Sequence, residues 1–343
     1  MSSASPNLPA IFRPGDVVVV RSAAEILETL DARGTRAGLP FMPEMIEHLG
    51  KRFVVSRKLE KTCVDGSPEG MREFRDNDVV FLEELRCDGA AHGGCGRACM
   101  LFWKAAWIKL AGAEPDAPPD AAEVALLQRR LLTRHDDGRY YCQSSDLDSA
   151  TQSLGRLGRA WKCVRNVAVG NSSVWGMVKL IVKPMRERIL VRLKPRWPSG
   201  PSEKTPVETL GLQAGDWVEV KSVEEISATL DPTGKNRGLQ FAYDLAWCCG
   251  KKFKVRSRLE HMVLERTGKY LDVRNTVLLE GVTCPCRCVI GGCGRADYIY
   301  WREIWVRKIP AHDIASIPDT EKGQPPACGS KRGRGVTETA GCC

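Results

Sequence analysis

The sequence predicts an α+β protein, mainly β with a helical middle, in which two small SH3-like β-barrel modules are joined by a basic helical segment. The first observation is a duplication: residues 15–60 align with residues 215–260 without a gap, and 20 of the 46 positions are identical. The second is the hexapeptide Gly-Gly-Cys-Gly-Arg-Ala, which occupies residues 93–98 and again residues 291–296. The third is a series of short β-branched stretches separated by turn residues. Duplication at this level predicts one fold for both copies.

Each copy opens with a Gly-Asp turn followed by a strand, at residues 15–20 and 215–220. A short helix should follow at residues 23–30 and 223–230. Both helices begin with the pattern Ser-x-x-Glu, in which serine and glutamate satisfy the first free N–H groups of a helix as a capping box.

The rest of each copy predicts one more short helix and three strands. The helices are expected at residues 43–49 and 243–249, and the strands at residues 53–59, 78–85 and 103–110 and at residues 253–259, 276–282 and 301–309. Several short strands in about a hundred residues suggest a strongly bent sheet or barrel. An SH3-like barrel with short helical insertions fits this pattern best.

The remaining segments connect or flank the two modules. A helix is expected at residues 121–134, and residues 146–194 should be helical in several pieces. The expected organisation is a disordered N-terminus (1–11), the first module (12–110), a linker (111–122), a helical basic segment (123–196), a second linker (197–210), the second module (211–310) and a disordered tail (311–343).

The composition is that of an ordinary soluble protein, with 43% hydrophobic and 27% charged residues among 343. Neither a signal peptide nor a transmembrane segment is recognisable, so we expect a cytoplasmic protein. In that compartment the 15 cysteines are expected to be reduced, which favours metal ligands or free thiols over disulfides. No common enzyme motif is present.

The second copy carries the densest group of cysteines. Cys284, Cys286 and Cys288 alternate along the chain, and Cys293 follows before a glycine. Four thiolates can close a tetrahedral site around one ion, and Cys249 is a further candidate ligand. Zinc is the predicted metal, with an iron–sulfur centre or iron as the lesser possibility.

The first copy predicts a second site with a different ligand set, Cys87-x4-His92-x2-Cys95-x3-Cys99. Only two cysteine positions correspond between the copies, Cys87 with Cys284 and Cys95 with Cys293, so the two sites need not be equivalent. The alternative is that these cysteines are small buried hydrophobic residues.

The middle of the chain is basic. Residues 151–210 contain twelve lysines and arginines but only three acidic residues. A segment of this kind can bind an anionic membrane surface or nucleic acid through residues 151–196, or dock on the barrels with its charges in water. The candidate basic surface consists of Lys179, Lys183, Arg186, Arg188, Arg192, Lys194 and Arg196.

Two pairs of tryptophans recur in the copies, Trp103 with Trp107 and Trp301 with Trp305. They are expected to pack in the core, and an aromatic binding platform is the alternative.

Distinctive motifs over residues 140–310 resemble a family of uncharacterised bacterial proteins. They include Tyr141-Cys142-Gln143, Thr205-Pro206-Val207-Glu208-Thr209-Leu210 and Trp301-Arg302-Glu303-Ile304-Trp305. The resemblance implies a bacterial protein with family cysteines at Cys249, Cys284 and Cys293, whereas Cys286 and Cys288 lie outside the family pattern. More distantly, residues 215–220 with residues 250–255 resemble the SH3-like repeats of mind-bomb-type ubiquitin ligases, which are substrate-binding modules.

These observations predict a non-catalytic binding or adaptor protein, with two cysteine-metal-stapled modules that recognise a protein or peptide partner. One alternative is a metal-dependent tailoring enzyme of a bacterial biosynthetic pathway that uses Cys249, Cys284 and Cys293 with an open coordination position. The other is peripheral attachment to a membrane or nucleic acid through the basic middle segment.

Overall fold

The computed structural model describes residues 12–64, 71–112, 118–179, 181–182, 198–284 and 294–314. These residues form two compact units. Unit 1 contains the described residues up to Met177 together with residues 263–271 and 294–295; unit 2 contains the others. The predicted α+β class is confirmed, whereas the SH3-like barrel remains a prediction. The helical middle up to Met177 belongs to unit 1, and so does a segment of the second copy.

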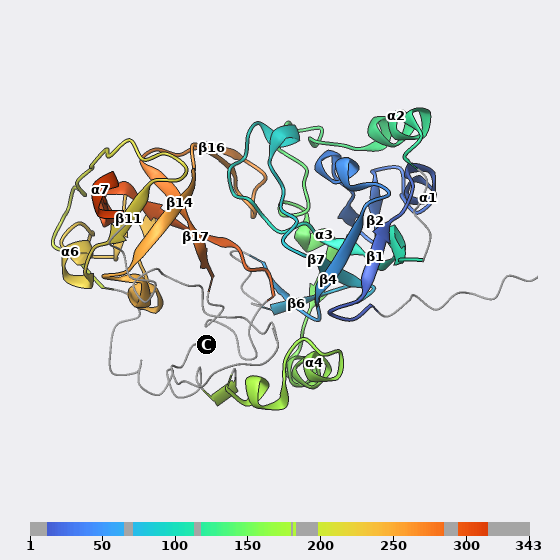
Figure 1. Cartoon of the computed structure of the whole chain (residues 1–343), viewed down its shortest axis with the longest axis horizontal. Helices are drawn as coiled ribbons and strands as arrows, with labels where there is room; N and C mark the ends of the chain where they lie inside the picture. The colour runs from blue at the N-terminus through green and yellow to red at the C-terminus, as the bar shows by residue number, and fades with distance from the viewer. Residues whose placement is uncertain are drawn as a thin grey trace, which may run out of the picture. The chain divides into compact units, whose positions relative to one another are not determined.

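The main sheet of unit 1 has five antiparallel strands, and β1, β4 and β7 run side by side in Figure 1. The central pairing places Val18 of β1 opposite Phe53 of β4 on one side and opposite Leu110 of β9 on the other. The strand order is β8 (Trp103–Lys104), β7 (Val79–Leu82), β4 (Arg52–Lys58), β1 (Val17–Val20) and β9 (Ile108–Leu110).

Unit 2 has a five-stranded sheet in which strands of corresponding sequence position follow the same order. Its register shifts between Val255 and Ser257, as the first sheet shifts between Val55 and Arg57. The order is β18 (Tyr298–Arg302), β17 (Thr276–Thr283), β14 (Lys252–Arg258), β11 (Trp217–Val220) and β19 (Val306–Lys308).

The short helices at the start of both copies begin where predicted but end three residues earlier than predicted. In α1 (Ala23–Leu27) and α6 (Val223–Ser227), the expected serine and glutamate make complete capping boxes. The next helices are η1 (Pro43–His48) and η4 (Tyr243–Cys248). Both are 3-10 helices, because their backbone hydrogen bonds join residues that are three positions apart. Two-residue hairpins join β2 (Thr35–Arg36) to β3 (Leu39–Pro40) and β12 (Lys235–Asn236) to β13 (Leu239–Gln240).

The single strands predicted at residues 103–110 and 301–309 are wrong. Each is interrupted by a 3-10 turn, η3 (Ala105–Trp107) and η5 (Glu303–Trp305). In unit 1 the turn redirects the chain, so that β8 pairs with β7 whereas β9 pairs with β1. The indole N–H of Trp107 holds the turn by donating to Thr29 Oγ1 at 3.1 Å.

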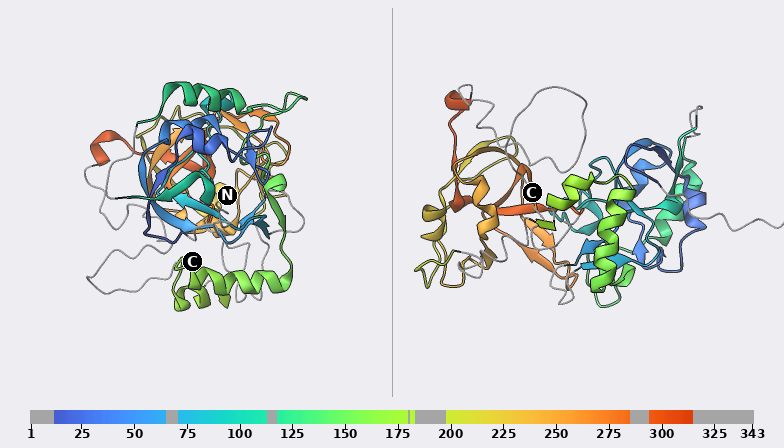
Figure 2. Two further views of the ribbon diagram at one scale, coloured as in Figure 1. Left: turned by 90° about the vertical axis from the view of Figure 1, so that its right-hand side faces the viewer. Right: turned by 90° about the horizontal axis from the view of Figure 1, so that it is seen from below.

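The segment after the first sheet combines helices with a second sheet. The helix predicted at residues 121–134 ends early, because Leu131 is extended and buried. Residues 151–153 are a strand rather than a helix, because they pair with the edge of β6. The elements are α2 (Ala121–Arg130), α3 (Leu147–Ala150), α4 (Arg156–Ala168) and the sheet β10 (Thr151–Ser153), β6 (Met71–Phe74), β5 (Thr62–Cys63). Within unit 1, α2 and α4 lie on opposite sides (Figures 1 and 2).

The remaining elements are η2 (Ala90–His92), α7 (Ala311–Ile314) and the paired strands β15 (His261–Val263) and β16 (Tyr270–Asp272). None of the helices in the described ranges is long and apolar enough to cross a membrane.

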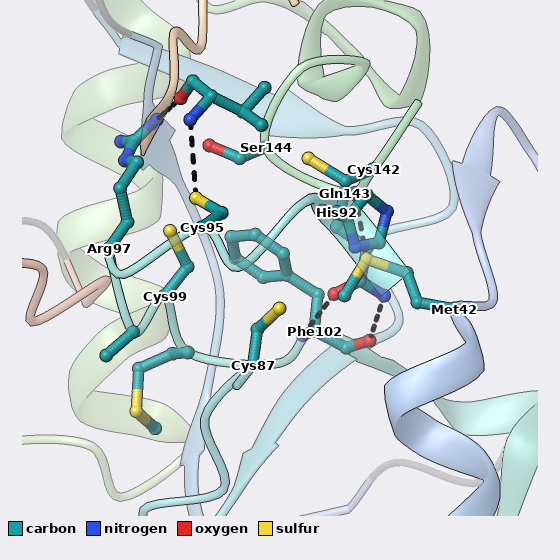
Figure 3. A pocket seen from close by; sticks show the side chains of 13 residues that line it. Met42, Cys87, His92, Cys95, Arg97, Cys99, Phe102, Cys142, Gln143 and Ser144 are labelled. Carbon is teal, nitrogen blue, oxygen red and sulfur yellow. Dashed lines mark hydrogen bonds between the residues drawn. The ribbon is translucent and has the colours of Figure 1, made fainter. Parts of the chain in front are cut away.

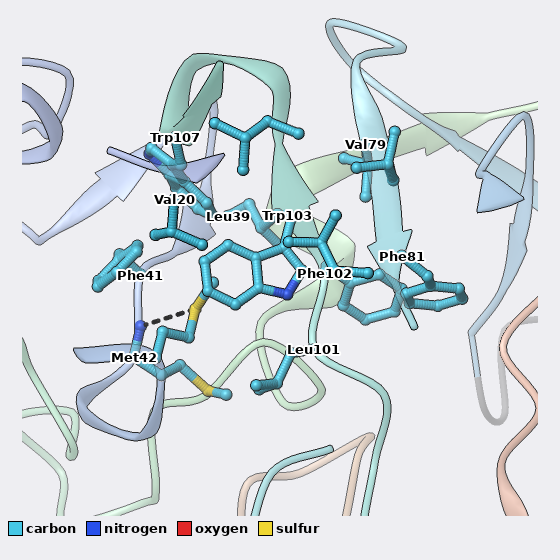
Figure 4. Close-up of a cluster of buried hydrophobic side chains, with 14 of the residues drawn as sticks. Val20, Leu39, Phe41, Met42, Val79, Phe81, Leu101, Phe102, Trp103 and Trp107 are labelled. Carbon is cyan, nitrogen blue, oxygen red and sulfur yellow. Dashed lines mark hydrogen bonds between the residues drawn. The ribbon is translucent and has the colours of Figure 1, made fainter. Parts of the chain in front are cut away.

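The core of unit 1 combines aromatic rings with aliphatic side chains (Figure 4). Trp103 and Trp107 are fully buried, and Phe41 meets the Trp107 ring edge-on with 5.2 Å between ring centroids. Trp301 and Trp305 are buried in the same way in unit 2. The packing interpretation of these four tryptophans is therefore confirmed, and the aromatic platform is wrong because all four side chains are buried.

Candidate metal centre

The four ligands predicted in the first copy line one cavity of unit 1 (Figure 3). Cys87, His92, Cys95 and Cys99 are joined there by Cys142. The cavity leaves about 30 Å³ for the centres of water-sized atoms. The remaining lining residues are mainly apolar or sulfur-containing and include Met42, Met100, Phe102 and Val263.

A tight loop brings the cysteines of the first copy together. The Cys87 N–H donates to the Cys99 carbonyl at 2.9 Å, which closes the loop at its base. Gly89 has a φ of +72°, and a Cβ at this position would lie 2.1 Å from the Cys95 carbonyl oxygen. Only glycine allows so close an approach, so this residue sets the path of the chain between Cys87 and Cys95.

Glu44, Cys87 and His92 form a buried group that could hold a metal ion, because one ligand atom from each lies within 4.8 Å of the other two. His92 Nδ1 lies 2.6 Å from Glu44 Oε1, and the Cys87 thiol donates to the same oxygen at 3.7 Å. Glu44 Oε2 is buried without a hydrogen-bond partner, which is unusual for a carboxylate oxygen.

Sequence reasoning missed Glu44. It comes from η1, far from the cysteines in the chain, and the signal that could have found it is the acidic residue at the matching position of the second copy, Asp244.

The surroundings of the cavity disfavour negative charge. Burial raises the pKa of the Cys87 thiol far above its usual range, and the carboxylate of Glu44 and the thiols of Cys99 and Cys142 raise it further. Burial also acts to raise the pKa of Glu44, but the hydrogen bond and charge of His92 outweigh it and hold that pKa below its ordinary value. A bound cation would compensate the negative charge that deprotonated thiols bring to this site.

Cys142 is the ligand candidate that the spacing of the first copy did not reveal. It belongs to the Tyr141-Cys142-Gln143 motif, 43 positions beyond Cys99. The neighbouring Gln143 fixes this segment against the core: its side chain accepts from the Phe102 N–H at 2.8 Å and donates to the carbonyls of Pro40 and Phe102 at 2.9 and 2.8 Å. Burial raises the pKa of the Cys142 thiol.

The second predicted site is only partly described. Cys284 is exposed, and Cys249 is half-buried, with a pKa that burial and Glu224 raise to about 11. Cys286, Cys288 and Cys293 lie outside the described residues, so this site stays a prediction. Of the basic surface, Lys179 is described and exposed; Lys183, Arg186, Arg188, Arg192, Lys194 and Arg196 lie outside the described residues.

No protein-family model, curated protein or solved structure matches this chain. The family resemblance inferred from the motifs therefore remains an expectation.

Proposed function

We propose that the chain is a non-catalytic binding protein whose unit 1 is stapled by a cysteine-bound metal centre. The observation that carries this proposal is the cavity on which Cys87, Cys95, Cys99 and Cys142 converge from two separate segments. A centre closed by protein ligands stabilises a fold, whereas a catalytic metal keeps a position open for water or substrate.

The size of the cavity supports a structural role. One enclosed water needs about 10–15 Å³ of this kind of space, and the cavity offers about 30 Å³. That is room for a small inorganic group and not for an organic substrate. Zinc, as the sequence predicts, and an iron–sulfur centre are both groups that thiolates bind.

We also take each five-stranded sheet to be an SH3-like barrel. The support is the connectivity: four strands form a meander, and the fifth follows a 3-10 turn and pairs with the first. The same order in both sheets supports two related binding scaffolds in one chain.

Metal content and stability test the staple. Full-length protein purified without added metal is expected to contain a tightly bound metal, and a chelator is expected to lower its unfolding temperature. Cys87→Ser should reproduce the effect of the chelator. Cys163→Ser serves as the matched control, because Cys163 is buried in α4 and does not line the cavity. Metal-free protein with an unchanged unfolding temperature in chelator would refute the proposal.

The partner-binding surface that we assign is the exposed apolar stripe of α4, formed by Leu157, Trp161 and Val164. These side chains are 88%, 60% and 57% exposed, and their i, i+4, i+7 spacing places them on one helix face. The face turned inward carries Lys162 and Cys163, which are buried. Such an inverted helix leaves its apolar face for a partner.

Ion pairs explain why α4 is held in this orientation. Lys162 Nζ lies 3.3 Å from a carboxylate oxygen of the buried Glu60 and 3.0 Å from one of Glu73, and it donates to Asn77 Oδ1 at 2.7 Å. Arg165 Nε lies 3.1 Å from Glu60 as well. Turning the stripe inward would break all of these contacts.

Attachment to an anionic membrane is the second candidate function for the same stripe. Residues 149–186 contain seven lysines and arginines and no acidic residue, which is a composition that favours an anionic surface.

Flotation with vesicles separates the two candidates. If a protein binds the stripe, Trp161→Ser should lose a specific co-purifying protein. Val207→Ser, which changes an exposed apolar residue elsewhere in the chain, should retain it. The membrane candidate predicts flotation with phosphatidylserine vesicles that fails in high salt and with phosphatidylcholine alone.

A further inference from the structure

We infer that the cavity of unit 1 binds an iron–sulfur cluster through the thiolates of Cys87, Cys95, Cys99 and Cys142. This inference rests on the proposed metal staple and names the centre within it. Figure 3 shows the four cysteine side chains around one cavity, with Phe102 among the residues that line it.

The spacing of the thiols disfavours a single ion. Zinc–sulfur bonds of about 2.3 Å require the sulfurs of a tetrahedral site to lie within about 4 Å of one another. In the described ranges, Glu44, Cys87 and His92 are the group with ligand atoms mutually within 4.8 Å. No three of these four described thiols meet that limit, although all four line the cavity. In a cluster, separate irons take separate cysteines, so the thiolates surround a larger group.

The two non-sulfur candidates are occupied with each other. His92 Nδ1 lies 2.6 Å from Glu44 Oε1, and His92 Nε2 lies 3.0 Å from the Tyr141 carbonyl oxygen. An imidazole that binds a metal directs a nitrogen lone pair at it, so His92 would have to give up one of these buried hydrogen bonds. His92 and Glu44 therefore support η2 and Cys87, and the cysteine thiolates are the ligands of the inferred cluster.

Backbone N–H groups point at two of the sulfurs. The Val263 N–H lies 3.3 Å from Cys95 Sγ, and the Ser145 N–H lies 3.4 Å from Cys142 Sγ. Hydrogen bonds of this kind stabilise cysteine thiolates and help to set the potential of iron–sulfur clusters. Met42, Met100 and Phe102 add an apolar wall.

The decisive experiment is the composition of the full chain purified without oxygen. We expect brown protein with visible absorbance that contains iron and acid-labile sulfide in equal amounts. Cys99→Ser and Cys142→Ser should each lose the colour, iron and sulfide. Cys163→Ser should keep them, because Cys163 does not line the cavity.

Other compositions overturn the inference in distinguishable ways. Colourless zinc-containing protein refutes the cluster but leaves the staple intact. An ion that survives Cys142→Ser and is lost in Glu44→Gln identifies a mononuclear site at Glu44, Cys87 and His92. Protein without metal, whose unfolding does not respond to chelator, refutes the cluster and the staple together. The wild-type composition decides even if a cysteine variant fails to fold.

Discussion

Arg97 and Arg295 bind the same carboxylate group, that of Glu265. They occupy the same position in the two copies of the hexapeptide. Arg295 makes a bidentate pair with Glu265, with both N···O distances 2.8 Å, and Arg97 Nη2 approaches Oε2 at 3.2 Å. Ser144 donates to Oε2 at 3.0 Å. The carboxylate is buried, so its charge depends on these partners.

Glu265→Gln is therefore expected to destabilise unit 1. Removing one member of a buried ion pair typically costs about 3–5 kcal/mol, because it leaves the remaining charges buried without compensation. Denaturant unfolding measures the loss. Glu260→Gln is the control, because Glu260 is exposed on the same stretch of chain and should change stability by less than about 1 kcal/mol. Equal stability of the two variants would contradict the importance of the pair.

Ala37→Asn is expected to stabilise unit 1. Ala37 and Gly38 form the two-residue loop between β2 and β3, with φ values of +49° and +78°. Both central residues of a type I′ turn need positive φ, and Asn-Gly suits it best. The gain should be up to about 1 kcal/mol, measured by thermal unfolding. Gly38→Ala should do the opposite, since its Cβ would lie 2.4 Å from the Ser149 carbonyl oxygen.

The stability of unit 1 is expected to fall as the pH decreases through about 6.5, the ordinary histidine value. Burial against Phe53 and Trp103 lowers the pKa of His48, and Lys51 lowers it further, whereas Glu47 raises it. The unfolded chain then takes up a proton that the folded chain does not, so stability is present above 6.5 and is lost toward the lower folded value. The free energy of unfolding, measured across this pH range, should change less with pH in His48→Gln than in the natural sequence. Parallel profiles for the two proteins would count against this assignment.

Gln143→Leu is expected to destabilise unit 1 by about 2–4 kcal/mol, because it leaves three buried backbone groups without their hydrogen bonds. The same variant should weaken metal retention, since Gln143 fixes the segment that carries Cys142. Unfolding and metal content are measured together. Gln152→Leu, at an exposed site, is the control and should affect neither.

Much of the fold could be predicted because local signals and the duplication agree. The capping boxes of Ser22 and Ser222 and the strands after the Gly-Asp turns depend on neighbours in sequence. The break before Trp107 could not be predicted, because Trp103 and Trp107 fit one strand face and the turn is fixed by Thr29, 78 positions away.

The candidate site shows the same division. Cys87, Cys95 and Cys99 could be predicted, because their spacing lies within one loop. Glu44 and Cys142 could not, because the packing of η1 brings Glu44 beside His92, and the segment held by Gln143 brings Cys142 to the cavity. His92, which the spacing suggested as a ligand, pairs with Glu44 in the buried group that could hold a metal ion.

Residues 263–271 belong to unit 1, although the second copy encodes them. The ribosome therefore finishes the cysteine loop and Cys142 long before it makes Val263 and Glu265. Until then, the growing chain lacks Val263, one of the residues that line the cavity. Unit 1 is thus completed late in synthesis, and a gene cut between the copies would leave unit 1 without residues 263–271.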